Sequence, residues 1–371
     1  MPDTVPPVLD SARKLRPART IALAGAALFA VLLLAIGLRL AWPISTPPFL
    51  DAQGHTLAHS IAVIGRWPIG GISQSVIIRG RDTRNPVLVW VHGGPGSSET
   101  PVVRHFNAAL EDGFVVVYWD QRYAGRTLDP SGPLPKNPRI DDYVSDLGSL
   151  VAQLRARLHS GKVVIVAHSW GTVPGLLYAE RHPENVAAYV GIGQEADTPE
   201  SERRSYAFLL REARLKGNAE DATRLLNLGP PHKGAPWTPR DLLQKYGAAF
   251  HADLDVPKLA LISAAASEVN WRDLAALFFA KRYNEAIEDA EANVVFDRDH
   301  LRFAVPMFFF SGRYDHTVDA ALAARYLARL SAPKKGFVWF ENSAHSPPFE
   351  EPAKFDAIML HEIRPLALAR P

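Results

Sequence analysis

The sequence predicts an α/β fold in which helices cover both faces of a mostly parallel central sheet. Apolar stretches alternate with helical patterns, the later stretches are continuous β-branched or aromatic runs, and two stretches lead into glycine-rich turns. Continuous apolar runs are typical of strands buried on both faces, and their alternation with helices is typical of parallel sheets. Strands are expected at residues 60–65, 74–79, 87–91, 114–119, 163–167, 186–192, 306–310 and 336–340. Helices are expected at 141–158, 173–181, 319–330 and 352–366.

The amino-terminal region predicts a membrane segment. From Ile21 to Leu38 the chain carries no charge, and a helix of this length roughly spans the hydrocarbon core of a bilayer. Basic side chains precede the run, which favours a cytoplasmic amino terminus. We therefore expect a basic cytoplasmic tail at 1–20, a transmembrane signal-anchor helix at 21–42 in the cell (inner) membrane, and an extracytoplasmic or periplasmic globular part. The alternative is secretion after cleavage of a signal peptide near Ala35-Ile36-Gly37.

The rest of the chain divides into a linker, a core and an insertion. The linker is expected at 43–59, and the α/β core at 60–193 and 301–371. Residues 194–300 break the strand–helix alternation, because they are charged, rich in Ala and Leu, and helical in pattern. A helical block inserted between two strands predicts a lid over a site at the sheet edge.

Composition narrows the classes of function. The formal net charge is +2, from 41 basic and 39 acidic residues, so there is no electrostatic basis for a nucleic-acid partner. Cysteine is absent, which excludes thiol catalysis, disulfides and thiolate metal sites. No metal site is predicted, and the oligomeric state stays open.

A serine lies in the turn after the strand at 163–167. In Ala167-His168-Ser169-Trp170-Gly171 it stands between small residues, and a helical pattern follows. Such a strand–turn–helix elbow exposes a serine nucleophile, so Ser169 is the candidate; an ordinary turn serine is the alternative.

A second glycine-rich turn, His92-Gly93-Gly94-Pro95-Gly96, follows the strand at 87–91. An earlier loop of this kind supplies backbone donors to the developing oxyanion in serine hydrolases. We expect the N–H of Trp170 to act together with that of Gly93 or Gly94. His92 is interpreted as an organiser of the loop.

The serine hydroxyl needs a base and an acid, and both are expected after later strands. Asp315 follows the strand at 306–310, and His345 follows the strand at 336–340. Loops at the carboxyl ends of parallel strands converge at one edge of the sheet. His345 would take the proton of Ser169, and Asp315 would orient the imidazole. The competing residues are His168, His300 and His316 for the base, and Asp297, Asp319 and Glu341 for the acid.

Together these segments resemble the proline iminopeptidase family, the S33 peptidase group of the α/β-hydrolase fold. The resemblance rests on His92–Gly96, Asp120–Thr127 (Asp-Gln-Arg-Tyr-Ala-Gly-Arg-Thr), Ala167–Gly171, Gly312–Asp315 and Ala344–Pro347. It covers roughly residues 60–352 and departs mildly where Ala167 replaces the first elbow glycine. It implies the triad Ser169, Asp315 and His345, no cofactor, and a bracing role for Asp120-Gln121-Arg122.

Substrate preference is expected to lie in the helical insertion. The resemblance implies insertion carboxylates that bind the free amine of a peptide, and position alone suggests Glu195 and Glu202. Solvated helix caps are the alternative for both. The predicted activity is therefore a serine hydrolase of small acyl or aminoacyl substrates that works through an acyl-enzyme. The resemblance implies an aminopeptidase of the proline iminopeptidase type, which prefers N-terminal proline. An esterase or amidase with the same triad is the other reading, as is an inactive binding protein on the same fold.

Overall fold

The computed structural model describes residues 15–41, 43–232, 239–251 and 254–369, and the chain divides into two units between Ile44 and Ser45. The first unit is helix α1 (Leu15–Ala41). Its stretch Thr20–Leu38 has a mean hydropathy of 2.7 and is, among the described residues, the one helix long and apolar enough to cross a membrane. A signal sequence has the same properties. Of the predicted segments, residues 1–14 and residue 42 lie outside the described residues.

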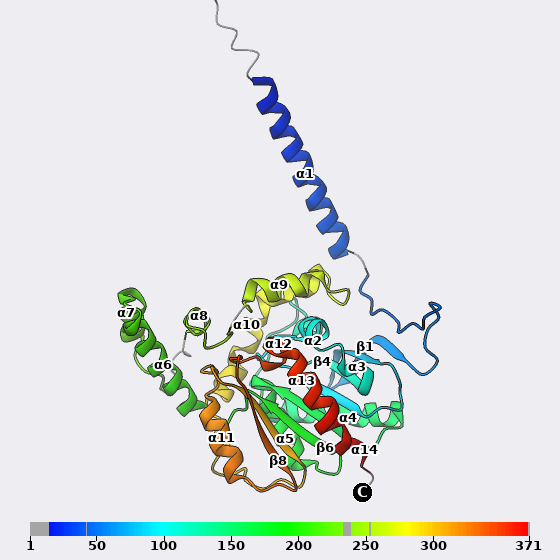
Figure 1. Cartoon of the computed structure of the whole chain (residues 1–371), viewed down its shortest axis with the longest axis vertical. Coiled ribbons are helices and arrows are strands. Elements are labelled where there is room, and N and C mark those ends of the chain that lie inside the picture. Colours follow the sequence, from blue (N-terminus) through cyan, green and yellow to red (C-terminus); the bar gives the residue numbers. More distant parts are fainter. Residues whose placement is uncertain (1–14, 42, 233–238, 252–253, 370–371) are drawn as a thin grey trace, which may run out of the picture. The chain divides into compact units, whose positions relative to one another are not determined.

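The second unit is built on a sheet of eight strands in its described part, in the order β1-β2-β4-β3-β5-β6-β7-β8 (Figure 1). The pairs β1–β2 and β2–β4 are antiparallel, and all other neighbours are parallel. The strands are β1 (Ile61–Ile69), β2 (Ile72–Gly80), β3 (Val87–Val91), β4 (Val115–Asp120), β5 (Val163–His168), β6 (Val186–Ile192), β7 (Met307–Gly312) and β8 (Lys335–Phe340). Every predicted strand is confirmed.

Strands β1 and β2 are longer than predicted because they form one hairpin. Pairing continues to Ile69 opposite Ile72, around a turn in which Gly70 and Gly71 both have positive φ. Pro68 lies inside β1, where it cannot donate to a ladder. It is tolerated because β1 is an edge strand of the sheet.

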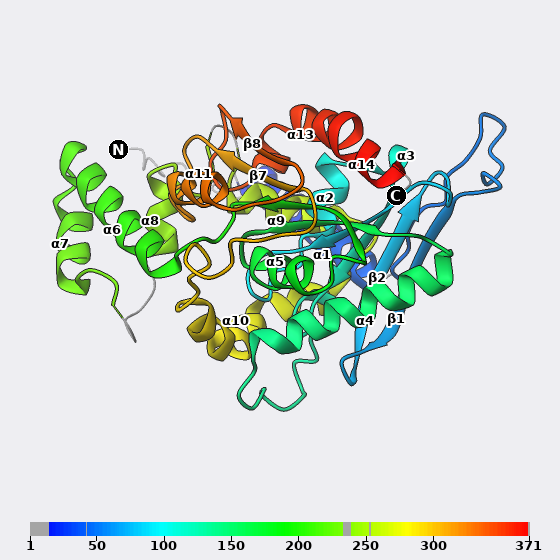
Figure 2. The ribbon, with the colours of Figure 1, turned by 90° about the horizontal axis from the view of Figure 1, so that it is seen from below.

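Helices cover both faces of the sheet, as predicted (Figure 2). Helices α4, α5 and α11 pack on one face, and α2, α3, α12 and α13 pack on the other. All residues of β3, β4, β5 and β7 are buried, which explains their continuous apolar sequence. The bounds are α2 (Thr100–Phe106), α3 (Leu110–Gly113), α4 (Ile140–Leu158), α5 (Thr172–Arg181), α11 (Ala320–Arg329), α12 (Pro347–Glu350), α13 (Pro352–Ile358) and α14 (Arg364–Leu368). Two 3₁₀ turns lie at Gly125–Thr127 and Ser169–Gly171.

The carboxyl-terminal helix expected at 352–366 is interrupted. Between α13 and α14 the chain forms a π-helical segment, Met359–Ile363. Pro365 stands at the second position of α14. Because proline has no N–H and its ring crowds the preceding turn, the regular hydrogen-bond ladder cannot run through this position.

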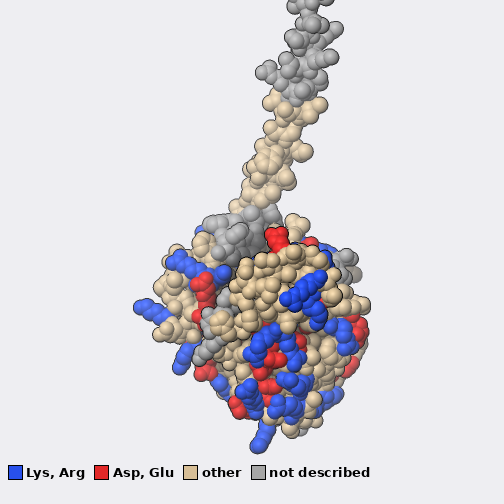
Figure 3. Space-filling model, turned by 90° about the vertical axis from the view of Figure 1, so that its left-hand side faces the viewer, with Lys and Arg blue, Asp and Glu red and all other residues tan. Residues whose placement is uncertain are grey.

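A block of helices lies between β6 and β7 and belongs to the same compact unit as the sheet. It contains α6 (Thr198–Leu215), α7 (Ala219–Leu228), α8 (Arg240–Lys245), α9 (Val256–Ala265) and α10 (Trp271–Glu291). The two ends of this helical insertion pair with each other, because Phe296 N donates to Ala196 O at 2.7 Å and Thr198 N to Val294 O at 2.9 Å. On the face shown in Figure 3, basic and acidic side chains are interspersed and form no field of one sign.

Candidate active site

Ser169 lies in a tight turn between β5 and α5. Its φ is +52°, a left-handed conformation that a non-glycine residue rarely adopts. A Cβ at Gly171 would lie 2.1 Å from Val91 O, so only glycine lets the turn approach β3 this closely. The local geometry is that of the predicted elbow.

Ala167, the departure from the family pattern, is accommodated by a glycine on the neighbouring helix. A Cβ at Gly175 of α5 would lie 3.0 Å from the Ala167 Cβ. The absence of a side chain at Gly175 therefore makes room for the methyl group of Ala167 while strand and helix stay in close contact.

Asp315 and His345 are brought together at the carboxyl edge of the sheet. The His345 Nδ1 donates to Asp315 Oδ2 at 2.9 Å, since an ionised carboxylate only accepts hydrogen bonds. Asp315 is 2% exposed, and its Oδ1 accepts the backbone N–H groups of Thr317 and Val318 at 2.9 and 3.0 Å. These bonds fix the carboxylate, which in turn fixes the imidazole.

The end of β6 lies against the His345 imidazole. Gly193 has a φ of +54°, and a Cβ there would lie 2.8 Å from His345 Cε1. Its N–H donates to Phe310 O on β7, so its backbone is held in place. The imidazole therefore sits on a backbone surface that leaves no room for a side chain.

The Ser169 turn and the His345 loop are joined through His168. Its Nε2 donates to His345 O at 2.9 Å, and the two imidazole centroids are 5.1 Å apart. Within the part of the chain that the structure describes, no hydrogen bond joins the Ser169 hydroxyl itself to His345. In unliganded sites such a bond often tightens only when substrate binds.

A partly buried glutamate that sequence reasoning missed organises the predicted oxyanion turn. Glu99 accepts hydrogen bonds from Gly93 N at 3.1 Å, from Trp90 Nε1 at 2.8 Å and from His168 Nδ1 at 2.6 Å. The Gly93 N–H is thus occupied, which leaves Gly94 as the donor expected from this turn. A Cβ at Gly93 would lie 3.1 Å from Ser169 Cβ, so turn and elbow are in contact.

The Glu99–His168 contact is a buried ion pair. Both His168 nitrogens face acceptors, a carboxylate and a carbonyl, so both carry hydrogen and the ring is a cation. Burial alone would lower the pKa of His168, but the charge of Glu99 and the hydrogen bond to it raise the pKa above its ordinary value. Burial would likewise raise the pKa of Glu99, and His168 lowers it.

The Asp120-Gln121-Arg122 segment braces the turn, in line with the role that the resemblance implies. Gln121 N donates to His92 Nε2 at 3.1 Å, and Gln121 Nε2 donates to His92 O at 2.7 Å. Arg122 binds Asp146 of α4 through two hydrogen bonds of 2.7 Å. His92 therefore organises the loop, as interpreted from the sequence.

A second missed carboxylate, Glu350, holds the loop that carries His345. Its Oε1 accepts from Ala344 N at 3.0 Å and Ser346 N at 3.1 Å, on either side of the histidine. Its Oε2 accepts from His251 N of the helical insertion at 2.6 Å. Burial raises the pKa of Glu350 to about 7, although the backbone donors oppose this rise.

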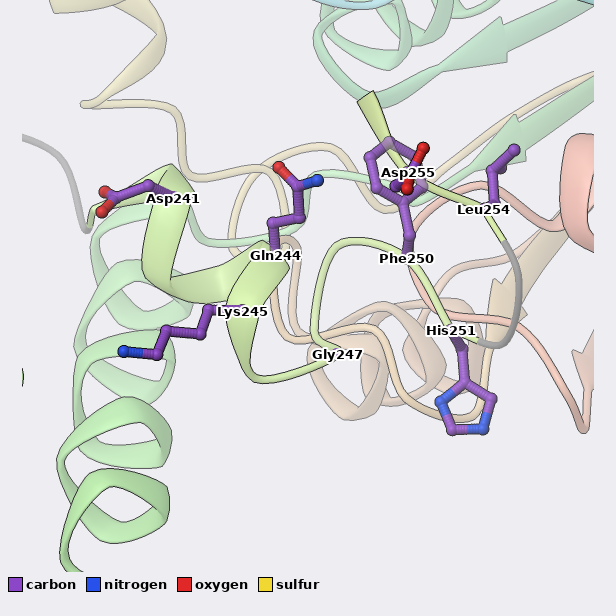
Figure 4. A pocket seen from close by; sticks show the side chains of 8 residues that line it. All are labelled: Asp241, Gln244, Lys245, Gly247, Phe250, His251, Leu254 and Asp255. Carbon is purple, nitrogen blue, oxygen red and sulfur yellow. The ribbon is translucent and has the colours of Figure 1, made fainter. Parts of the chain in front are cut away.

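The insertion also contacts the catalytic loops directly. His345 N donates to Ala249 O at 3.1 Å, and His316 N donates to Ala248 O at 3.3 Å. Beside this segment is a pocket of about 460 Å³, lined by residues of α8 and by Gly247, Phe250, His251, Leu254 and Asp255 (Figure 4). None of the three predicted triad residues lines it, so it lies outside the reacting centre.

Three buried carboxylates of the insertion form a cluster: Glu195, Glu202 and Glu291, each between 3 and 6% exposed. Glu195 accepts from Thr198 Oγ1 at 2.8 Å, and Glu202 binds Arg240 at 2.9 Å. Burial and the Glu202 charge raise the pKa of Glu195 to about 7, and the Asp315 charge contributes to the rise.

Glu291, at the end of α10, was not singled out from the sequence. Burial and then the Glu195 charge raise its pKa well above the ordinary value. The acidic run Glu285–Glu291 surrounds it with similar residues, so sequence alone gives no signal for it. Glu195 and Glu202 are not solvated caps, because both are buried. Among the described residues, no group of three or more His, Cys, Asp or Glu side chains is placed to hold a metal ion.

Comparisons with known proteins agree on the type of fold and chemistry. A family model described as alpha/beta hydrolase fold matches residues 86–352. The chain is 30% identical over 317 residues to the probable aminopeptidase YbaC of Bacillus subtilis (strain 168), covering 80% of this chain and 94% of that protein. It is 36% identical over 166 residues to a probable proline iminopeptidase of Streptomyces coelicolor, covering 39% and 49%. The crystal structure of a proline iminopeptidase-related protein from Thermus thermophilus matches with a TM-score of 0.57 and 20% identity, over 84% of this chain and 100% of that one.

Proposed function

The chain belongs to the α/β-hydrolase family and is a proline iminopeptidase-like hydrolase, and from this premise we propose that it is a serine aminopeptidase. The observation that carries the proposal is the 2.9 Å bond between His345 Nδ1 and Asp315 Oδ2, at the sheet edge that also bears the Ser169 elbow. The bond directs the other imidazole nitrogen, Nε2, away from the acid, where it can accept a proton.

The proposed reaction has two halves. Ser169 Oγ attacks the carbonyl carbon of the substrate while its proton passes to His345 Nε2. The carbon–nitrogen bond then breaks, and the leaving amine takes that proton. Water attacks the acyl-enzyme, gives a proton to His345, and the returning proton releases Ser169. The N–H groups of Trp170 and Gly94 stabilise the oxyanion, and one such donor typically contributes about 3 kcal/mol.

The carboxylate cluster supports the assignment as an aminopeptidase rather than an esterase. Glu195, Glu202 and Glu291 are buried together, and among the described residues the cation acting on all three is Arg240. Burial and the neighbouring carboxylates raise the pKa of Glu195 and of Glu291, so a positive charge beside them is favoured, and the ammonium group of a free peptide amino terminus supplies it. We propose that this cluster holds the substrate's amine beside the triad. The substrate class is thus a small peptide with a free amino terminus.

For the location of the enzyme we propose a single-pass anchor with the globular unit outside the cytoplasm. The support is the uncharged helix Thr20–Leu38 with basic residues before it. Protease added to intact spheroplasts should digest the globular unit. Its protection would contradict this orientation.

Two measurements test the activity. The Ser169→Ala variant should lose labelling by a fluorophosphonate probe and all turnover, with its unfolding midpoint unchanged. A matched control is Ser160→Ala, since the Ser160 hydroxyl is buried without a hydrogen-bond partner and lies outside the site. A panel of proline arylamide, other aminoacyl arylamides, an N-acetylated arylamide and a short acyl ester tests the substrate class. Turnover of the ester alone would replace the peptidase proposal with the esterase alternative.

A further inference from the structure

Helix α9 of the insertion is an apolar helix without a buried side. Its sequence, Val256-Pro-Lys-Leu-Ala-Leu-Ile-Ser-Ala-Ala265, carries one charge, and none of its residues is buried. Val256 is 52% exposed and Leu261 is 72% exposed. A surface helix normally buries its apolar residues and exposes polar ones. In α9 only Leu259 packs partly against the core, while Val256 and Leu261 stay exposed, which marks the helix as a contact surface.

An open groove of about 450 Å³ runs beside α9 and extends this surface. Leu261 and Ile262 of α9 line one side, Pro101 of α2 lines another, and Pro47 of the linker completes it. Arg104, His105 and Glu268 also line the groove, so its wall is mixed, with apolar side chains at α9 and at Pro47 and Pro101.

The linker is fixed to the globular unit at the carboxyl end of α9. Ser45 N donates to Ser267 O at 3.0 Å, and Arg79 Nη1 donates to Pro47 O at 2.7 Å. Helix α1 ends at Ala41, only four residues before Ser45. Four residues reach at most about 14 Å even when fully extended. This maximum reach is about twice the thickness of the headgroup layer on one side of a bilayer, which is roughly 5–8 Å.

From the exposed apolar helix, the groove and this short tether we infer that α9 is a membrane-docking surface that rests in the lipid interface. The inference builds on the anchor assigned to α1 under the proposed function. If Thr20–Leu38 spans the bilayer, the short tether limits how far Ser267 and the adjoining end of α9 can lie from the headgroups. Leu261 and Val256 then enter the apolar boundary of the lipid, as interfacial helices do.

The absence of cysteine makes a direct test possible with single-cysteine variants of the full chain. Leu261→Cys reports on α9. Leu368→Cys on α14 is the matched control, an exposed leucine (50%) at the far end of the globular unit from α9 (Figure 1). Leu28→Cys reports on α1. Each variant is labelled with an environment-sensitive fluorophore and reconstituted in phosphatidylcholine vesicles with or without spin-labelled phosphatidylcholine.

Docking predicts that the label at residue 261 is quenched at least threefold more than the label at 368, and that the label at 28 is quenched most by deep spin labels. Equal quenching at 261 and 368, with strong quenching at 28, would overturn the docking surface and leave the anchor intact. A blue shift at 261 without lipid quenching would assign α9 to contact with a second copy of the chain and would also overturn it. No quenching at 28, or loss of α1 by cleavage, would remove the anchor and the docking surface together. The peptidase activity is independent of all these outcomes.

Discussion

A methyl group added at Gly193 should disable the enzyme by displacing the imidazole of His345, the proposed base. The added Cβ in Gly193→Ala would lie 2.8 Å from His345 Cε1 and 3.0 Å from His345 Nδ1. The backbone at residue 193 cannot retreat easily, because its N–H is bound to Phe310 O. The imidazole must therefore move by about 0.7 Å to reach an ordinary carbon–carbon contact of about 3.5 Å.

The size of this shift sets the expected loss of activity. Catalytic groups must be held within about 0.5 Å of their productive position, and a 1 Å displacement costs about 100-fold in rate. We expect kcat/KM to fall by about 10- to 100-fold, with a parallel fall in the rate of fluorophosphonate labelling. Because φ is +54° at this position, alanine also adds backbone strain, which lowers the free energy of unfolding by about 1–2 kcal/mol.

A matched control separates the two effects. Gly217 has a φ of +67°, but a Cβ there would meet no atom within 4 Å. Gly217→Ala should therefore lose about the same stability and keep its activity. Labelling kinetics and denaturant unfolding are measured for both variants. If Gly193→Ala were labelled at the wild-type rate, His345 would not be the base, or its imidazole would not rest on β6, and the reasoning would be refuted.

Three further predictions concern buried charges. The pKa of Glu195 is about 7 in the folded chain instead of 4.5, so between these two pH values the folded chain binds more protons than the unfolded chain. The free energy of unfolding therefore falls as pH rises through this window, by up to about 3 kcal/mol. Glu195→Gln should flatten this slope in pH-dependent unfolding. Wild-type kcat/KM should rise through pH 7 more steeply for a free-amine substrate than for an N-acetylated one, because both reactions need the base His345 but only the first needs the ionised cluster. Identical pH profiles would exclude amine binding by the cluster. Glu350→Gln places an NH₂ group against backbone N–H donors, so it should lower the free energy of unfolding by about 1–3 kcal/mol and lower kcat more than KM. The control Glu341→Gln, at an exposed position, should leave kcat and KM unchanged. Equal kinetics for the two variants would contradict a positioning role for Glu350. Arg79→Met leaves the buried Glu111 carboxylate without its closest cation and should destabilise the chain by about 3 kcal/mol in denaturant unfolding; a loss under 1 kcal/mol would show that this pair is dispensable.

The sheet and the reacting residues were predictable because their signals are local. Strands buried on both faces need continuous apolar runs, and a tight elbow needs small residues around Ser169. Asp315 could be chosen because it follows such a strand, and His345 because it follows the apolar run of the edge strand β8. The structure confirms the strands and joins these two residues by a hydrogen bond. The participation of Ser169 in the same triad stays a prediction.

The supporting residues were not predictable, because their roles depend on contacts between distant segments. Glu99 follows a glycine-rich turn and resembles any loop carboxylate until the fold places it beside His168. Glu350 lies five residues after His345, and only the fold returns its carboxylate to the histidine loop. Glu291 is hidden in an acidic helix. Helix α9 has no alternation of apolar and polar faces, so its ten residues carry no periodic signal.

The bonds between the helical insertion and the histidine loop have a mechanical consequence. Ala249 O accepts a hydrogen bond from the backbone N–H of His345, the proposed base. His251 N donates to Glu350, which in turn binds the loop that carries His345. If residues 249–251 moved away to admit a peptide, His345 would move with them and lose its position beside Ser169. A substrate should therefore enter past parts of the helical insertion other than residues 249–251, so that His345 keeps its position while substrate binds.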